Sequence, residues 1–354
     1  MASPPSDADL ALARAAAARP LAGTGPDAAR RLAAADWSAG VVEEGGASHR
    51  VLVLPGTGAV RMTRDARAAA RLPANVALVA ALADTARLPV DLPVPLTEVV
   101  TAADGTAAVV QGYLPGRPHP PHTGDPAVLR ALCAALAAVD TAPLLPHLAP
   151  PFAYRGPWPA ARVERLRRLP DRLRRAHGAA LWDGPWAAEH PAVSAARFPD
   201  AAEELLDTLR SWTEDPVVPP ALVHGDLAGH NMRWMRGGTA GPAASPRAPW
   251  RLTGILDWDL ASRWDPALNA AHLSLWHGED RLGEIARDPF EAHRARAWLG
   301  WTALEALDDA AGREDPSSSL RPPDWPRLLR RVLPRLGRAV AALRGAGQGR
   351  SVAR

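Results

Sequence analysis

The chain has 354 residues, 47% hydrophobic and 22% charged, which is enough for one large domain or for two lobes with their own cores. All 41 basic residues are arginine, and 38 acidic residues leave a net charge of +3, so no basic face of the kind that binds nucleic acid is evident. Because lysine is absent, the composition excludes a P-loop with its Gly-Lys-Ser/Thr sequence and enzymes that need an amine nucleophile.

The chain shows no sign of secretion or membrane insertion. Its first residues lack the basic and apolar regions of a signal peptide, and the longest apolar stretch, 76–83, is far shorter than a membrane span. The only cysteine, Cys133, lies in an apolar helical pattern, so no internal disulfide can form. We therefore expect a cytoplasmic protein, monomeric or homodimeric, that binds neither nucleic acid nor membrane.

The N-terminal third of the chain predicts a small β-rich region. Residues 1–36 have an alanine-rich helical pattern interrupted at 20–26, and residues 66–86 have helical spacing with Pro73 near the helix start. Apolar runs bounded by turn residues, which are typical of strands, occur at 51–54, 59–62, 96–100 and 107–113. We predict one lobe over residues 1–113, with 1–36 as a helical extension.

The segment LPGRPHPPHTGDP, residues 114–126, is too rich in proline and glycine for regular structure and is the expected hinge. Helical patterns dominate beyond it, at 126–141, 159–177 with a possible kink at Pro170, 198–213, 266–277, 290–311 and 324–345. Strands are expected among these helices at 221–223, 231–235 and 250–257, with a low-complexity loop at 237–249. The pattern predicts an α+β protein with a second lobe over 127–346 and a disordered tail at 347–354.

Polar side chains gather where these strands end. LVHGDLAGHN, residues 222–231, follows the first strand, and GILDWD, residues 254–259, ends the last. A hairpin would bring Asn231 close to Asp257, with Asp226 in the loop before them. Carboxylate and amide oxygens suit Mg²⁺, which keeps several waters and completes its shell with substrate phosphates. A carboxylate such as Asp226 can accept a hydroxyl proton, so the set suits phosphoryl transfer.

The order His-x-Asp-x₄-Asn, hairpin and Leu-Asp-Trp, followed by DPALNAA at 265–271, resembles the aminoglycoside phosphotransferase-like family. This branch of the protein-kinase fold includes antibiotic, choline and homoserine kinases. The resemblance covers about residues 40–310. It implies a two-lobed kinase-like fold, in which a small β-rich lobe with one main helix binds nucleotide. The larger, mostly helical lobe would carry a catalytic β-hairpin and bind the acceptor.

The resemblance also implies a role for each matching residue of the second lobe. Asp226 would be the catalytic base that deprotonates the acceptor hydroxyl. Asn231 and Asp257 would be the Mg²⁺ ligands. His224 and Asp265 would support the catalytic loop. His230 could be a surface residue or could touch substrate, so it stays open.

In the small lobe, the resemblance places the loop EEGGASHR, residues 43–50, over the nucleotide phosphates. VVQGYLPG, residues 109–116, would be the hinge that contacts the nucleotide base. The nucleotide-binding candidates are Gly45, Gly46, Ser48, Arg61, Gln111 and Tyr113.

The chain departs from the family pattern at two positions. Kinases use a lysine on the third strand to hold the donor phosphates, and Arg61 stands there instead. The helix glutamate that would pair with that base aligns with Asn75. Glu43 or Glu44 could replace it as a partner of Arg61.

We therefore expect an ATP- or GTP-dependent O-phosphotransferase that uses Mg²⁺ and acts on a hydroxyl of a small molecule, such as an aminoglycoside or macrolide antibiotic. The missing lysine–glutamate pair favours, as an alternative, a pseudokinase that binds nucleotide or another ligand. A metal-dependent hydrolase built from His224, Asp226, His230 and Asp257 is a third hypothesis.

The acceptor stays open because both kinds of pocket have candidate residues. Asp259 could lie near the metal, line the acceptor pocket or be a solvated charge. A tryptophan-lined pocket would suit a macrolide. A polycationic aminoglycoside would need carboxylates, and those of the region 266–311 are Glu279, Asp280, Glu284, Asp288, Glu291, Glu305, Asp308 and Asp309.

Overall fold

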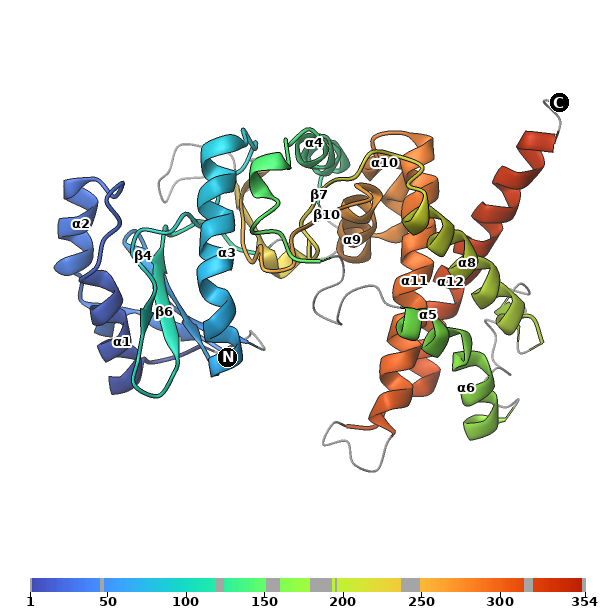
Figure 1. Ribbon diagram of the computed structural model, residues 1–354, viewed down its shortest axis with the longest axis horizontal. Helices are drawn as coiled ribbons and strands as arrows, with labels where there is room; N and C mark the ends of the chain where they lie inside the picture. The colour runs from blue at the N-terminus through green and yellow to red at the C-terminus, as the bar shows by residue number, and fades with distance from the viewer. Residues whose placement is uncertain are drawn as a thin grey trace. The chain divides into compact units, whose positions relative to one another are not determined.

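The computed structural model describes residues 2–44, 48–118, 124–150, 160–178, 193–194, 196–236, 249–314 and 321–351. The chain divides into two compact units, and it combines sheets with helices, so the α+β class is confirmed (Figure 1). The first unit comprises Met1–Val128, Ala138–Ala149 and Asp226–Ala261, and the second comprises Leu129–Ala137, Pro150–Gly225 and Ser262–Arg354. The hairpin region therefore groups with the first unit, whereas the predicted lobe boundaries assign it to the second lobe.

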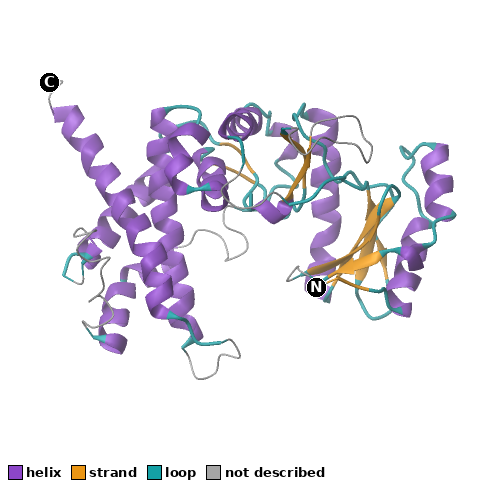
Figure 2. Cartoon of the chain, turned by 180° about the vertical axis from the view of Figure 1, so that it is seen from behind, coloured by secondary structure: helices purple, strands orange, loops and turns teal. Residues whose placement is uncertain are grey.

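The first unit contains a six-stranded antiparallel sheet in the order β1-β2-β3-β4-β6-β5. Figure 2 shows the strands in orange. Its strands are β1 Ala2–Ser3, β2 Val41–Glu43, β3 His49–Leu54, β4 Gly58–Thr63, β5 Val100–Thr101 and β6 Ala107–Gln111. The predicted β3–β4 hairpin is confirmed. The strand predicted at 96–100 is wrong except for Val100, because Thr97 forms only an isolated bridge with Pro20, which has no N–H to extend a ladder.

Helices cover both faces of this sheet: α1 Asp7–Ala17 and α2 Pro26–Ala33 on one face, and α3 Ala66–Thr85 on the other (Figure 1). Successive strand residues point to opposite faces. In β4 the residues on either side of Arg61, Val60 and Met62, belong to the core cluster shared with α1. Arg61 is opposite Val109, which packs with Leu72 of α3. The strand period therefore places Arg61 on the face that α3 covers.

α3 is, within the described ranges, the one helix whose length and composition would allow it to cross a membrane. It begins where Asp65 caps the N–H of Ala68 at 2.7 Å, so Pro73 lies inside the helix and not near its start. Leu72 and Leu82 are fully buried in the first unit. Burial of one apolar stripe is the ordinary property of a helix packed on a sheet.

The first unit also holds the hairpin of β8 Met232–Arg236 and β9 Trp250–Ile255. Backbone hydrogen bonds join it to segments next to the sheet. Asp91 donates to Thr253 O at 2.8 Å and accepts from Ile255 N at 3.1 Å, and Arg117 exchanges two backbone bonds with Trp234. Gly116, at φ 117°, permits this approach, because a Cβ there would lie 2.8 Å from Trp234 O. The hairpin end is thus fixed relative to β4.

The second unit is mainly helical. Its helices are α4 Pro126–Ala137, which begins in the first unit, α5 Ala160–Arg167, α6 Leu169–His177, α8 Phe198–Glu214, α9 Ala267–His277, α10 Leu282–Ile285, α11 Pro289–Arg313 and α12 Trp325–Ser351. Single-turn 3₁₀ helices are η1 Trp37–Ala39, η2 Ala142–Leu144, η6 Gly229–Asn231 and η7 Glu279–Arg281. β7 Ala221–Val223 pairs with β10 Ser262–Trp264. The predicted break near Pro170 is present between α5 and α6, while α12 extends into the predicted disordered tail.

The helices of the second unit pack closely. A Cβ at Gly300 of α11 would lie 2.7 Å from Ala339 of α12 and from Leu205 of α8, so glycine permits this three-helix contact. Cys133 of α4 is only 1% exposed, and burial raises the pKa of its thiol. The apolar helical pattern around Cys133 therefore belongs to the buried face of α4.

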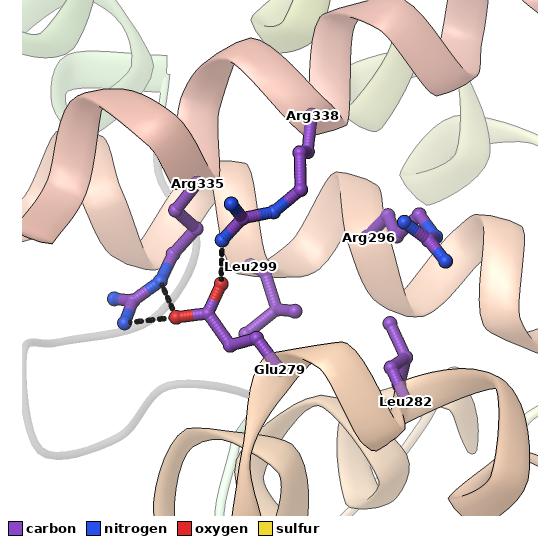
Figure 3. A pocket seen from close by; sticks show the side chains of 6 residues that line it. All are labelled: Glu279, Leu282, Arg296, Leu299, Arg335 and Arg338. Carbon is purple, nitrogen blue, oxygen red and sulfur yellow. Dashed lines mark hydrogen bonds and ion pairs between the residues drawn. The ribbon is translucent and has the colours of Figure 1, made fainter. Parts of the chain in front are cut away.

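Glu279 links η7 to α12 (Figure 3). Its carboxylate accepts hydrogen bonds from Arg335 Nε and Nη2 at 2.8 and 2.6 Å, and from Arg338 Nη2 at 2.7 Å. Burial acts to raise the pKa of Glu279, but the hydrogen bonds and charges of the two arginines lower it below its usual 4.5. The three residues lie around a small hollow, whose other lining residues are Leu282, Arg296 and Leu299.

We predict that Glu279→Gln lowers the free energy of unfolding at pH 7 by about 1–3 kcal/mol, because charge-assisted hydrogen bonds to two arginines are lost. Since the folded-state pKa lies below the unfolded one, this stabilisation is present above about pH 4.5 and is lost as the pH falls through the folded-state value. Urea unfolding at several pH values should show the gap between wild type and variant closing in acid. Glu284→Gln, at an exposed position of α10, is the control, and an equal effect there would contradict the prediction.

Candidate active site

The side chain of Arg61 is held by two carboxylates from the end of the β8–β9 hairpin. Its Nη1 donates to Asp259 Oδ1 at 2.7 Å, and its Nη2 donates to Asp259 Oδ2 at 2.5 Å and to Asp257 Oδ1 at 3.2 Å. Arg61 is 9% exposed. Burial alone would lower the pKa of Arg61, but the two carboxylates raise it, so the guanidinium stays charged. The first unit thus gathers a buried cation and two anions at one point.

His49 of β3 completes the surroundings of Arg61. Its Nδ1 lies 3.1 Å from Arg61 Nη2. Burial, and next the charge of Arg61, lowers the pKa of His49 to about 4. The ring is therefore neutral at neutral pH, and its Nδ1 can accept a hydrogen bond from the guanidinium. Sequence reasoning did not single out His49, because a histidine beginning a strand carries no motif.

Asp257 has an unusual backbone. Its φ of 60° makes it the only described residue other than glycine in the left-handed region. Such a conformation costs on the order of 1 kcal/mol and persists where neighbours impose it. Here Leu256 N bonds to Asn231 O at 2.8 Å, and the indole of Trp258, 1% exposed, donates to Ile255 O at 3.2 Å. The turn after β9 therefore fixes where the Asp257 carboxylate lies.

The Asp257 carboxylate lies among other negative charges. Crowding by protein atoms raises its pKa, although 48% of the side chain remains solvent-accessible. Asp259 and Asp226 raise the pKa of Asp257 further, while Arg61 and His230 lower it. The net shift is upward, so Arg61 does not fully compensate the local negative charge. A second cation would stabilise the ionised form of Asp257.

Asp226 and Asn231 form a pair within the loop before β8. Asn231 Nδ2 donates to Asp226 Oδ2 at 2.9 Å and to Asp226 O at 3.0 Å. Asn231 is 5% exposed, while 39% of the Asp226 side chain is accessible. His230 Nε2 lies 3.9 Å from Asp226 Oδ2. A buried amide thus orients an accessible carboxylate, which is what a catalytic base requires.

These residues fit a divalent cation with few protein ligands. Asn231 uses its amide nitrogen on Asp226, and its Oδ1 forms no hydrogen bond with a described residue, so that oxygen is available as a ligand. Asp257 supplies an under-compensated carboxylate. In the described part of the chain, no group of three or more His, Cys, Asp or Glu side chains could hold a metal. Two protein oxygens supplemented by water and phosphate are typical of Mg²⁺.

His224 belongs to the second unit, where it is fully buried. Its backbone N–H donates to Asn269 Oδ1 at 3.1 Å, and Asn269 Nδ2 donates to Leu222 O at 2.9 Å. Asn269 of α9 is itself 0% exposed. It holds both ends of the strand-to-loop turn, a role that sequence reasoning did not assign, although Asn269 lies inside the DPALNAA motif.

Asp265 also lies in the second unit, at the start of α9. Its Oδ1 accepts from Ala267 N at 2.9 Å, its Oδ2 accepts from Trp298 Nε1 at 2.8 Å, and Arg294 Nε lies 3.2 Å from both oxygens. The carboxylate therefore joins α9 to α11. Its predicted support of the catalytic loop stays a prediction, and the contacts named here concern helix packing.

The nucleotide-side candidates are only partly described. Gly45 and Gly46 lie outside the described residues. Ser48 accepts a backbone bond from Arg64 N at 3.0 Å, and Gln111, 7% exposed, ends β6. Tyr113 follows β6. Their predicted contacts with nucleotide stay predictions.

The expected replacement partners of Arg61 are wrong. Glu44 forms its ion pair with Arg64. Glu43 is exposed at the end of β2, and Asn75 of α3 forms no side-chain hydrogen bond with a described residue. The bidentate partner of Arg61 is Asp259. From the sequence, Asp259 could have been a residue near the metal, a residue of the acceptor pocket or a solvated charge. The sequence feature that could have identified Asp259 is its place as the second carboxylate of GILDWD.

Most of the carboxylates considered for a cationic acceptor have partners inside the second unit. Glu291 is fully buried and accepts from Arg287, while Asp288 caps α11. The remaining pairs are Glu279 with Arg335 and Arg338, Glu305 with Arg162, and Asp308 with Arg165 and Arg172. The expectation of an acidic acceptor pocket gains no support from these residues.

We predict that Asn269→Leu lowers the free energy of unfolding by about 2–5 kcal/mol, because His224 N–H and Leu222 C=O lose a buried partner while the volume is nearly kept. Chemical denaturation followed by circular dichroism measures this. Asn75→Leu, the same change at a half-buried helix position, should shift it by less than about 1 kcal/mol. An equal loss in the free energy of unfolding at both positions would show that the Asn269 hydrogen bonds do not stabilise the turn.

The chain is similar to several phosphotransferases of known sequence or structure. A viomycin phosphotransferase of Streptomyces vinaceus is 33% identical over 95 residues, which are 25% of this chain and 30% of that protein's length. The GDP complex of wild-type aminoglycoside 2'-phosphotransferase-IIIa superimposes with a TM-score of 0.53 at 16% identity, over 85% of this chain and 91% of that one. A thermostable mutant of an aminoglycoside phosphotransferase with ADP and hygromycin B gives a TM-score of 0.50 at 17% identity, over 86% and 94%.

These structures confirm the predicted kinase-like fold. The sequence model of the Phosphotransferase enzyme family matches residues 41–309, which contain β2 to β10 and the Asp226, Asn231 and Asp257 positions. The chain therefore belongs to the phosphotransferase enzyme family, as its motifs predict.

Proposed function

We propose that the protein transfers the γ-phosphoryl group of ATP or GTP to a hydroxyl of a small molecule. The observation that carries the proposal is the meeting of Arg61 on β4 with Asp257 and Asp259 at the hairpin end. The paired Asp226 and Asn231 lie in the same unit, and the Asp226 charge acts on Asp257. A cation for phosphates, oxygens for a metal and an accessible base are the parts that phosphoryl transfer needs. The solved relatives that contain GDP or ADP support nucleotide as the donor.

Asp226 acts as the base in this proposal. Its carboxylate accepts a hydrogen bond from the acceptor hydroxyl, and Asn231 Nδ2 holds it in orientation at 2.9 Å. The hydroxyl oxygen forms a bond to the γ-phosphorus while the bond from that phosphorus to the β–γ bridging oxygen breaks. The hydroxyl proton passes to Asp226, and nucleoside diphosphate leaves with the bond's electron pair.

Asn231 Oδ1 and Asp257 would hold Mg²⁺, which neutralises charge on the donor phosphates when it is bound. Arg61 binds the same phosphates through the guanidinium N–H groups that its carboxylate partners leave unused. The left-handed backbone at Asp257 fixes its carboxylate before any ligand arrives. The residues therefore need little rearrangement to receive the donor.

We propose a hydroxylated antibiotic as the acceptor. The partial similarity to a viomycin phosphotransferase, and the fold shared with an aminoglycoside phosphotransferase that binds hygromycin B, support this class. At least five of the eight candidate carboxylates of region 266–311 are used in intramolecular bonds, which disfavours recognition of a polycation by those residues. A panel should therefore include macrolides and viomycin as well as aminoglycosides.

A nucleotide-binding pseudokinase is the second candidate, since the lysine–glutamate pair is absent. The bidentate Arg61–Asp259 pair argues against loss of donor binding, because it holds a charged group at the position that we propose binds the phosphates. We also propose a cytoplasmic location, in accord with the single buried thiol of Cys133, and a monomeric or homodimeric state.

We predict that Asp226→Asn lowers kcat by about 10²–10⁴-fold, because the proton acceptor is lost while shape is kept. The nucleotide Kd should stay within about threefold of wild type, since Asp226 does not bind the donor in this proposal. Turnover is followed by nucleoside diphosphate release over the antibiotic panel, and products are checked by mass spectrometry for one added phosphoryl group.

Asp27→Asn, at an exposed carboxylate of α2 that pairs with Arg30, is the matched control and should keep wild-type turnover. Equal turnover in Asp226→Asn and wild type would remove Asp226 from the mechanism. Tight nucleotide binding by wild type without transfer to any acceptor or to water would favour the pseudokinase.

A further inference from the structure

The guanidinium of Arg61 needs a carboxylate partner to lie where it does. It is 9% exposed in the middle of β4, and burial of an unpaired charge is costly. α3 covers this face of the sheet, and its residue at the position where the family resemblance implies a glutamate partner is Asn75, which carries no charge. Asp259 supplies two oxygens to two guanidinium nitrogens instead, with a side chain 21% exposed. The pairing is bidentate, which fixes the plane of the guanidinium as well as its place.

The pairing leaves donors of Arg61 unused. Nη1 uses one N–H for its hydrogen bond to Asp259. Nη2 is within hydrogen-bond distance of Asp259, Asp257 and His49. Nε and the second N–H of Nη1 form no hydrogen bond with a described residue. A guanidinium with five N–H groups can therefore keep its Asp259 pair and still bind phosphate oxygens.

Asp257 and Asp259 differ in what they can do. Both oxygens of Asp259 are engaged by Arg61, whereas Asp257 meets Arg61 by one contact at 3.2 Å. Without Asp259, the closest carboxylate left to Arg61 is Asp257, so the guanidinium would lie across the candidate metal ligand. Asp259 thus holds Arg61 so that its contact with the candidate metal ligand Asp257 is limited to one hydrogen bond of 3.2 Å.

We propose that Asp259 is the positioning residue for Arg61, and that it takes the part of the absent helix glutamate by holding the guanidinium for the donor phosphates. This inference rests on the proposed function in one respect, the identity of the donor as a nucleotide. In this proposal Asp259 acts through Arg61. Asp259 needs no contact with a metal or with the acceptor for this role.

The test measures binding and not turnover. Displacement of a fluorescent ATP analogue gives the Kd of ADP for wild type, Asp259→Asn, Arg61→Gln and the double variant, each with Mg²⁺ and with excess EDTA. We expect Asp259→Asn to weaken ADP about tenfold in both conditions, because the guanidinium is no longer held. The double variant should be no weaker than Arg61→Gln alone, since both changes remove one unit. Adenosine, which has no phosphate, should bind all four proteins equally.

Conservative variants separate positioning from folding. Asp259→Glu keeps a carboxylate and should retain ADP binding within about threefold, whereas Arg61→Lys keeps charge but loses the fork and should bind as weakly as Asp259→Asn. Asp27→Asn is the control for a lost surface carboxylate. Thermal unfolding of each variant establishes that it is folded at the assay temperature. If Asp259→Asn does not fold, the proposal is tested by comparing ADP affinity in Asp259→Glu and Arg61→Lys. Equal ADP affinity in these two variants overturns the proposal.

The inference is overturned by unchanged ADP binding in Asp259→Asn, by weakening seen only with Mg²⁺, or by additive losses in the double variant. Weakening only with Mg²⁺ would make Asp259 a metal-side carboxylate. Absence of nucleotide binding by wild type would overturn this inference and the proposed function together. If the Asp259 and Arg61 variants weaken ADP binding non-additively, as expected, but wild type transfers no phosphoryl group to any acceptor, only the proposed function is overturned.

Discussion

The buried positive charge of Arg61 is the constraint on which the candidate site depends. A guanidinium on the covered face of a sheet must have anionic partners, and the chain supplies them from residues about 200 positions later. Because the partners come from the hairpin end, the sheet and the hairpin must be assembled before the charge is compensated. The donor side and the base side of the site are therefore parts of one folded unit.

Backbone contacts fix that assembly before any side chain contributes. The hairpin bonds to Asp91 on one side and to Arg117 on the other, and both contacts need the chain to approach closely. Gly116 and Gly254 allow it, since a Cβ at Gly254 would lie 2.8 Å from Leu114. A side chain at either position would move the hairpin end, and Asp257 and Asp259 would move with it. Glycine at these positions thus serves the geometry of the charges.

Local patterns predicted most of the elements, because each is encoded in adjacent residues. The β3–β4 hairpin, the long α3 and the break near Pro170 all follow from turn residues and helical spacing. The motifs also singled out Asp226, Asn231 and Asp257, which the structure brings into one unit. The partner of Arg61 could not be predicted this way, since its choice depends on which carboxylate reaches a nitrogen across the fold. Asn269 was missed for the same reason, because its two hydrogen bonds cross 45 and 47 positions of sequence.

The absence of lysine makes that choice of partner understandable. A lysine ammonium is a compact charge that can meet a single oxygen from a neighbouring helix, whereas a guanidinium is satisfied best by two oxygens in its own plane. A carboxylate at the end of a fixed hairpin can offer both, and the left-handed turn at Asp257 sets the direction in which the chain leaves β9. The change from lysine to arginine on β4 therefore removes the need for a glutamate on α3. It also transfers the support of the donor site from a helix to the same turn that carries the candidate metal ligand, so the two functions become mechanically linked.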